Sequence, residues 1–231
     1  MLYIRKNHRD TAEYQFLTKF LDSGYFNKYN QGDYNITLIQ EPFTEVGYAD
    51  LVCVRWRKNI NIKWNEQRRN IVKNDIKVLH HLYNCKKFKS STDIVADLGF
   101  SHRQVDKILF NLSEADLIIE NKNRDKVKAR NVNDIFLIKD IVAIEAKLRD
   151  WKGALRQSIN NMSFASHSIS LLPESTINGN LLKHYKKTEI GVLSFGDKYR
   201  QVLKPKRMPI PANITSWYFN EYIGRTACLT C

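Results

Sequence analysis

Apolar residues in the first quarter of the chain recur first at helical spacing and then at strand spacing. The helical spacing over residues 10–21 predicts an amphipathic helix. Two strands are expected to follow it, over 36–43 and 48–56, with a bend near Gly47. The helix is expected to face the core with Phe16, Leu17, Phe20 and Leu21.

The same kind of pattern returns near residue 135. It predicts strands over 135–148, 167–173 and 189–195, with helices over 150–162 and 180–187 between them. Strands that alternate with helices are typical of α/β proteins, so we expect a mixed sheet flanked by helices. The side chains expected to face inward from the first of these helices are Trp151, Leu155, Ile159 and Met162.

The middle of the chain has a different pattern. Residues 57–69 are polar and basic, which favours a linker. Short helices are expected over 74–84 and 91–98, and Gly99 is well suited to end the second of them.

A third helix in this segment is predicted to begin after Ser101. Ser101 and Gln104 have the spacing of a capping box, and the apolar residues that follow recur at helical spacing. Residues 117–130 then predict a hairpin with a basic return strand. Three helices and a basic hairpin in this order resemble a winged helix-turn-helix. The apolar residues expected to face inward from the third helix are Val105, Ile108, Leu109 and Leu112.

This change of pattern predicts two domains. Residues 1–56 and 135–231 would form a discontinuous α/β core, and residues 70–134 would form the inserted domain.

Composition narrows the choice of function. The chain has 231 residues, 43% of them hydrophobic and 26% charged, as in ordinary globular proteins. The apolar runs fall short of the roughly 20 residues that a membrane span needs, and the N-terminus does not resemble a signal peptide. We therefore expect a cytoplasmic protein that does not enter a membrane. The net charge of +13 favours a polyanionic partner, of which nucleic acid is the commonest.

Candidate chemistry lies where a buried strand ends. The apolar run 141–144 leads directly into Glu145 and Lys147, whose side chains would share one face of the strand. Asp50 lies near the start of the strand predicted over 48–56. If these two strands pair antiparallel, the three charged side chains meet at one edge of the sheet.

Two carboxylates placed side by side favour the binding of a metal ion. Two adjacent carboxylates repel unless a positive charge joins them, and an oxygen-only site suits Mg²⁺ or Mn²⁺. Lys147 could then help to activate a water molecule or neutralise charge on a phosphate. The simpler alternative is a solvated strand end, with a surface ion pair worth less than about 1 kcal/mol.

The motif G-x-x-D at 47–50, E-x-K at 145–147 and Gln157 in the next helix resembles the PD-(D/E)XK nuclease superfamily, which has the restriction-endonuclease-like fold. The resemblance covers roughly residues 10–56 and 135–196, with Ala49 where a proline is often found. It implies a core of helix, three antiparallel strands, helix and strand. It also implies that Asp50 and Glu145 bind the metal, that Lys147 is the catalytic lysine and that Gln157 supports the site.

Glu13 has two interpretations. In many members of this superfamily an acidic residue of the first helix reaches the metal site, and Glu13 is placed to do so. The pair Asp10 and Glu13 also has capping-box spacing, which would explain Glu13 by a local role at the helix start.

The inserted domain offers a set of nucleic-acid contacts. Exposed donors of its third helix would read DNA, and basic residues of the hairpin would lie along phosphates. Winged helices also bind proteins, and a charged hairpin is often only solvated, so both alternatives stand. The predicted DNA-binding residues are His102, Arg103, Lys107, Asn111, Lys122, Arg124, Lys126, Lys128 and Arg130.

The leading hypothesis is a Mg²⁺- or Mn²⁺-dependent DNA endonuclease, with RNA as an alternative substrate. The second hypothesis is a non-catalytic DNA-binding or regulatory protein on a nuclease-like scaffold. The resemblance also allows a homodimer, because many enzymes of this superfamily work as dimers to cut two strands. Cys228 and Cys231 have the spacing of half a zinc site, although an ordinary chain end explains them as well.

Overall fold

A computed structural model of the chain describes residues 2–4, 11–58 and 64–228. It divides into two compact units, which are described separately below. Unit 1 consists of residues 1–58 and 138–216, and unit 2 consists of residues 59–137 and 217–231.

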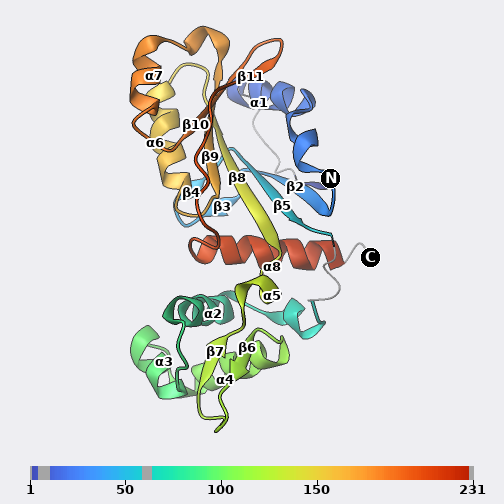
Figure 1. Cartoon of the computed structure of the whole chain (residues 1–231), viewed down its shortest axis with the longest axis vertical. Coiled ribbons are helices and arrows are strands. Elements are labelled where there is room, and N and C mark those ends of the chain that lie inside the picture. Colours follow the sequence, from blue (N-terminus) through green and yellow to red (C-terminus); the bar gives the residue numbers. More distant parts are fainter. Residues whose placement is uncertain (1, 5–10, 59–63, 229–231) are drawn as a thin grey trace. The chain divides into compact units, whose positions relative to one another are not determined.

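Unit 1 is built on a mixed sheet, which contains seven strands among the described residues (Figure 1). Their order is β1-β2-β5-β8-β9-β10-β11. β2, β5 and β8 are successively antiparallel, and β8, β9 and β10 are successively parallel. The strands are β1 (Leu2–Ile4), β2 (Tyr34–Gln40), β5 (Leu51–Arg57), β8 (Ile138–Ala146), β9 (His167–Pro173), β10 (Gly191–Phe195) and β11 (Tyr199–Leu203).

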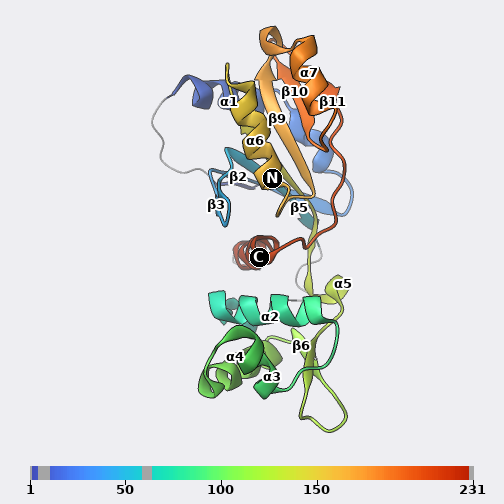
Figure 2. The same cartoon turned by 90° about the vertical axis from the view of Figure 1, so that its left-hand side faces the viewer.

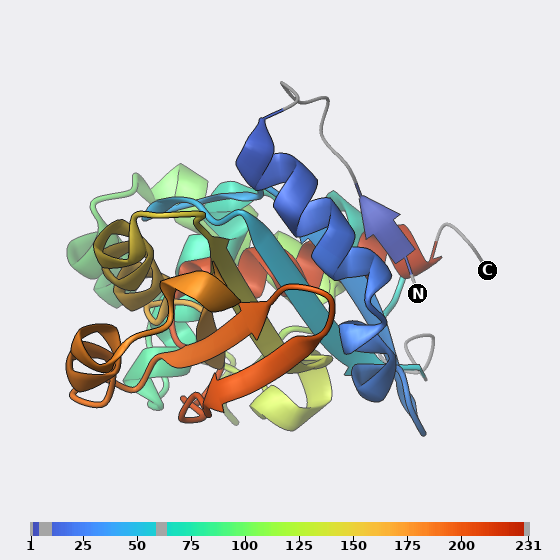
Figure 3. The same ribbon diagram turned by 90° about the horizontal axis from the view of Figure 1, so that it is seen from above.

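Helices cover both faces of this sheet, and Figure 3 shows α1 on one side with α6 and α7 on the other. Leu17 and Phe20 of α1 are buried against apolar residues of β2, β5 and β8, as the helical pattern predicted. A second apolar cluster joins α6 and α7 to the opposite face. The mixed sheet flanked by helices is therefore confirmed. The helices are α1 (Ala12–Asp22), η1 (Tyr25–Tyr29), α6 (Trp151–Asn161), η4 (Glu174–Thr176) and α7 (Gly179–Tyr185).

The strands before and after Gly47 differ from the prediction. The strand predicted over 36–43 ends at Gln40, because Glu41 has a φ of 44° and Pro42 has no N–H to donate to a neighbouring strand. A small separate hairpin follows, formed by β3 (Phe43–Thr44) and β4 (Gly47–Tyr48). The predicted bend is present at Gly47, whose φ of 111° suits glycine.

The inward face of α6 also differs from the prediction. Ile159 is 46% exposed, and the large side chains of Trp151, Leu155 and Met162 are only partly buried. Smaller residues of α6 face the sheet instead, because β9 presents hydroxyl groups there: the Oγ atoms of Ser158 and Ser170 lie 2.8 Å apart. The fully buried residues of α6 are Gly153, Ala154, Ser158 and Asn161.

Unit 2 contains three helices followed by a two-stranded hairpin, as predicted for this segment (Figure 2). Gly99, with a φ of 70°, ends the second of these helices. The predicted capping box is present, since Ser101 and Gln104 exchange side-chain and backbone hydrogen bonds. The elements are η3 (Gln67–Asn70), α2 (Lys73–Cys85), α3 (Ser91–Leu98), α4 (His102–Glu114), β6 (Ile118–Glu120), β7 (Val127–Ala129), α5 (Val132–Ile135) and most of α8 (Ile214–Cys228).

The C-terminal helix packs in unit 2 rather than in the α/β unit, which differs from the predicted domain boundary. The physical reason is a buried ion pair: Arg68 donates from Nη2 to Oε1 of Glu221 at 2.8 Å and from Nε to Oε2 at 3.1 Å. The Arg68 guanidinium also lies 3.8 Å from the centre of the Trp64 ring. Trp217 of α8 packs edge-on against Phe136.

Candidate functional site

The strand register brings the predicted acidic residues together. In the antiparallel pair of β5 and β8, Leu51 lies opposite Ile144. Asp50 immediately precedes β5 and Glu145 is near the end of β8, so both carboxylates lie at the same edge of the sheet. The Asp50 carbonyl accepts a hydrogen bond from the Glu41 N–H at 3.1 Å, which holds the backbone at this point.

Asp50 and Lys147 are in direct electrostatic contact. Asp50 Oδ2 accepts a hydrogen bond from the Ala146 N–H at 2.8 Å and lies 3.9 Å from Nζ of Lys147. The same Nζ lies 3.3 Å from Oε2 of Glu13. The lysine ammonium is therefore held between a carboxylate of α1 and a carboxylate at the start of β5.

Glu145 is the most deeply buried member of the group, with no exposed surface. Its Oε1 accepts a hydrogen bond from Nδ2 of Asn161, on α6, at 2.8 Å. Its Oε2 is buried without a hydrogen-bond donor among the described residues. An unpartnered carboxylate oxygen is costly inside a protein unless a proton or a cation is bound to it.

Burial controls the charge of both carboxyl groups. Desolvation, reinforced by the neighbouring Asp50, raises the pKa of Glu145 to about 8. Desolvation also raises the pKa of Asp50, although Lys147 and the Ala146 N–H oppose this rise. The negative charge of Asp50 favours the protonated form of Glu145, so the two carboxyl groups can hold one proton between them.

Lys147 remains positively charged in this setting. Burial disfavours its ammonium, but the attraction of Asp50 and Glu13 is stronger in sum and raises the pKa of Lys147 above its ordinary value. The site thus contains a fixed cation beside two carboxyl groups that hold fewer negative charges than they would in water.

The donor set fits a hard divalent cation. Asp50 and Glu145 offer only oxygen ligands, and Oε2 of Glu145 is buried without a hydrogen-bond partner among the described residues. A bound Mg²⁺ or Mn²⁺ would take the place of the proton that the two carboxyl groups hold and balance both charges.

Gln157 makes no hydrogen bond to these carboxylates among the described residues. It is half-buried on α6, one helical turn before Asn161. Asn161 is the residue that contacts Glu145, and it was not among the predicted site residues. The sequence signal that could have identified Asn161 is its position as a polar residue on the buried side of an amphipathic helix.

Glu13 belongs to this group rather than to the helix cap. The N-cap of α1 is Thr11, whose side chain accepts a hydrogen bond from the Tyr14 N–H. With Thr11 as the N-cap, Glu13 does not occupy the third helical position that a capping box uses. Asp10, the other residue of that interpretation, lies outside the described residues. The Glu13 side chain reaches toward Lys147 instead.

The predicted DNA-binding residues of unit 2 fall into two groups. Six are exposed on α4 or on the hairpin: His102, Arg103, Lys107, Lys122, Arg124 and Lys126. The other three have partners within the unit. Asn111 was expected to be an exposed donor, but it is half-buried and donates from Nδ2 to Oδ1 of Asp75 at 3.4 Å. Lys128 lies over the Phe88 ring, and Arg130 pairs with Asp116.

The hairpin of β3 and β4 carries exposed apolar side chains that were not predicted. Phe43 is 74% exposed, Tyr48 is 52% exposed and Val46 is 41% exposed. The two aromatic rings are in contact, with centres 5.3 Å apart. The hairpin ends two residues before Asp50, so these side chains lie close in sequence to the acidic group.

Comparisons with protein-family models, with curated proteins and with solved structures find no match to this chain. Across the described part of the chain, every helix is too short or too polar to cross a bilayer. The Cys228 and Cys231 pair lies outside the residues whose side chains the structure describes. The case for a function therefore depends on the geometry of the charged residues.

Proposed function

We propose that this chain is a metal-dependent DNA endonuclease of the PD-(D/E)XK type. The observation that carries the proposal is the buried, unpartnered Oε2 of Glu145, in a carboxyl group that interacts with Asp50 and lies beside a charged lysine. A structural ion pair would satisfy its oxygens, whereas a binding site leaves one ready for a ligand. The order α1, β2, β5, β8, α6 and β9 is consistent with the core of helix, three antiparallel strands, helix and strand.

Each residue of the group would have a distinct role. Asp50 and Glu145 would hold the ion, which when bound lowers the pKa of a coordinated water and neutralises charge on a phosphate. Lys147 would orient the attacking water and stabilise negative charge that develops on the scissile phosphate. Glu13 holds the Lys147 ammonium at 3.3 Å and would keep it aimed at the reacting group.

Asn161 would prepare Glu145 for the ion. Its N–H donor at Oε1 favours the ionised form of Glu145 and leaves Oε2 as the free ligand atom. Because Asn161 would act through Glu145 and touch no substrate, it is a positioning residue. Gln157, on the same side of α6, would contact the site only through substrate or water.

Surface features support nucleic acid as the substrate. The net charge of +13 favours a polyanion, and we interpret the three helices and hairpin of unit 2 as a winged helix that grips DNA. The exposed Phe43 and Tyr48 side chains would stack on bases or press into a groove next to the cleavage site.

A nicking assay on supercoiled plasmid tests the proposed activity. Wild-type protein with Mg²⁺ or Mn²⁺ should nick the plasmid, and Asp50→Asn and Lys147→Met should each reduce the rate by about 100-fold or more, because each removes several kcal/mol of transition-state stabilisation. Glu189→Gln is the matched control, since this carboxylate pairs with Lys206 at the surface. Nicking that is equally fast in all four proteins, or absent from the wild type, would favour the non-catalytic alternative.

A binding assay tests the winged-helix interpretation. Lys122, Arg124 and Lys126 are exposed, so replacing all three with Ala should weaken DNA binding and reduce the slope of log K against log salt by up to about 3. Replacing Lys183, Lys186 and Lys187 in the α7 region with Ala removes the same charge elsewhere and serves as the control. Equal slopes in the wild type and the hairpin variant would contradict a DNA-binding hairpin.

A further inference from the structure

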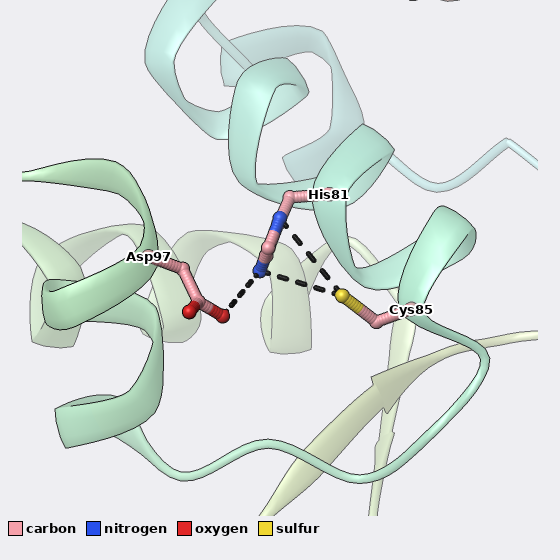
Figure 4. Close-up of side chains that lie close together, drawn as sticks. All are labelled: His81, Cys85 and Asp97. Atoms are coloured by element: carbon pink, nitrogen blue, oxygen red, sulfur yellow. Dashed lines mark hydrogen bonds and ion pairs between the residues drawn. The ribbon is translucent and has the colours of Figure 1, made fainter.

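Unit 2 contains a cluster of three side chains with metal-binding chemistry that the proposed nuclease reaction does not use. His81 and Cys85 are four residues apart on α2, so they lie on one face of the helix, and Asp97 comes from the end of α3. Nε2 of His81 lies 3.0 Å from Oδ2 of Asp97 and 3.5 Å from Sγ of Cys85 (Figure 4). One ligand atom from each residue lies within 4.8 Å of the other two.

This arrangement does not suit a nucleophilic cysteine. In a Cys-His-Asp triad, the thiol and the carboxylate bind opposite nitrogens of the imidazole, so that one orients the ring and the other exchanges a proton. Here both groups are closest to the same atom, Nε2, and Sγ lies farther from Nδ1, at 3.9 Å. The thiol and the carboxylate therefore approach the same nitrogen instead of forming a relay through the ring.

The two distances from Nε2 of His81 are close to those between ligands of one tetrahedral ion. With Zn–N and Zn–O bonds near 2.0 Å and a Zn–S bond near 2.3 Å, adjacent ligand atoms lie about 3.3–3.6 Å apart. The 3.5 Å between Nε2 of His81 and Sγ of Cys85 lies in this range. The 3.0 Å between Nε2 and Oδ2 of Asp97 is slightly shorter, so a bound ion would move these two atoms a little apart. A soft sulfur with a borderline imidazole nitrogen selects Zn²⁺ over Mg²⁺ or Ca²⁺.

Lys89 would compete with a metal ion for the Asp97 carboxylate. Its ammonium donates to Oδ2 of Asp97 at 2.9 Å, and this hydrogen bond holds the pKa of Asp97 below its usual range. The carboxylate is therefore ionised and already has a positive partner. The lysine side chain is only partly buried and flexible, so it can move away and leave Oδ2 of Asp97 for the metal.

We propose that His81, Cys85 and Asp97 form a Zn²⁺ site that joins α2 to α3, with a water molecule as the fourth ligand. This site is separate in chemistry from the carboxylate site and stands whether or not the chain cuts DNA. The ion would stabilise the first two helices of the segment interpreted above as a winged helix.

Titration of the metal-stripped, full-length protein with Co²⁺ tests the site. Co²⁺ should bind at one ion per chain and produce a thiolate-to-metal absorption band, which carboxylate ligands alone cannot produce. The titration is made in an Asp50→Asn, Glu145→Gln background, so that the acidic site does not contribute. Cys85→Ser should abolish the band, and His81→Ala should weaken binding by about 100-fold, because a three-ligand site loses one third of its ligands.

Matched variants make the result decisive. His80→Ala changes the neighbouring histidine, whose Nε2 contacts Asn84 instead of the cluster, and should leave Co²⁺ binding unchanged. The double variant Cys228→Ser, Cys231→Ser should also retain the band. A band that survives Cys85→Ser, or that disappears only in the double variant, would overturn the proposal.

Thermal stability provides a second readout that does not depend on cobalt. Zn²⁺ should raise the melting temperature of the wild type and of Lys89→Ala, and should have no such effect on His81→Ala. An equal rise in all three proteins would mean that Zn²⁺ binds elsewhere, which contradicts this site.

Discussion

Two lysine–carboxylate pairs in this chain have similar partners and opposite electrostatics. Lys147 lies 3.9 Å from Asp50 in unit 1, and Lys89 lies 2.9 Å from Asp97 in unit 2. The pKa of Asp50 is raised, because burial outweighs the attraction of its lysine. The pKa of Asp97 is lowered, because the Lys89 hydrogen bond outweighs the opposing effect of desolvation.

The difference shows that burial decides in which direction the pKa of the carboxyl group in such a pair moves. In a surface pair, water stabilises the charged carboxylate even without the lysine, so the ion pair itself contributes little free energy. A buried carboxylate lacks that solvation, so a proton or a bound cation is needed to offset its charge. Substitutions in the two regions should therefore differ in size and in pH dependence.

The largest expected effect lies in a third pair, which is fully buried and fully hydrogen-bonded. Arg68→Met leaves Glu221 without its two guanidinium bonds in the core of unit 2. Removing one partner of such a pair should lower the free energy of unfolding by about 3–5 kcal/mol. Urea denaturation followed by circular dichroism measures it, with the exposed neighbour Arg69→Met as control. If Arg68→Met lowers the free energy of unfolding no more than Arg69→Met does, the buried pair does not contribute more to stability than a surface residue.

Glu145→Gln tests the buried pair through pH. The pKa of Glu145 is about 8 in the folded protein and 4.5 ordinarily, so the folded protein binds the extra proton between these pH values. Its stability should fall as pH rises from about 4.5 to 8, by an amount on the order of 2 kcal/mol in metal-free buffer. The glutamine variant mimics the protonated acid and should lack this loss. Parallel stability profiles for the two proteins would contradict a raised pKa.

Asn161→Ala should have an intermediate effect. It removes the donor that favours the ionised form of Glu145, so the pKa of Glu145 should rise further. The pH dependence of metal-activated nicking should then move upward by roughly 1 unit, which corresponds to one hydrogen bond to a charged group. Asn160→Ala, on the exposed side of α6, is the control. A lower rate without a shifted profile would indicate that Asn161 has only a structural role.

Lys89→Ala should have the smallest effect. In metal-free buffer, its removal takes one partner from a carboxylate that water already solvates, so the urea midpoint should stay within error of the wild type. A clear loss of stability would show that this surface pair is as important as the buried ones.

The main elements of this fold can be read from the sequence because their signals are local. The apolar stripe of α1, the buried run of β8 and the Ser101 capping box each depend on residues a few positions apart. The meeting of Asp50 with Glu145 also followed from a simple rule, since antiparallel neighbours bring the start of one strand to the end of the other.

The features that were missed depend on tertiary partners. α6 presents Ala154, Ser158 and Asn161 to the sheet because β9 offers serine hydroxyls and β8 offers Glu145, and hydrophobicity alone favours the bulkier side. Asn111 turns inward because Asp75 lies within reach. The C-terminal helix joins unit 2 because Glu221 neutralises a buried arginine far away in sequence. Such choices require knowing which distant residue is the neighbour.

The position of the inserted segment has a consequence for how the protein is made. β5 ends at Arg57, and its sheet partner β8 begins only at Ile138. A ribosome adds about 5–20 residues per second, so roughly 80 residues of delay leave the free edge of β5 without its neighbour for about 4–16 s. An unpaired apolar edge invites pairing with other nascent chains. Slower synthesis should therefore lengthen the interval in which newly made molecules are open to aggregation.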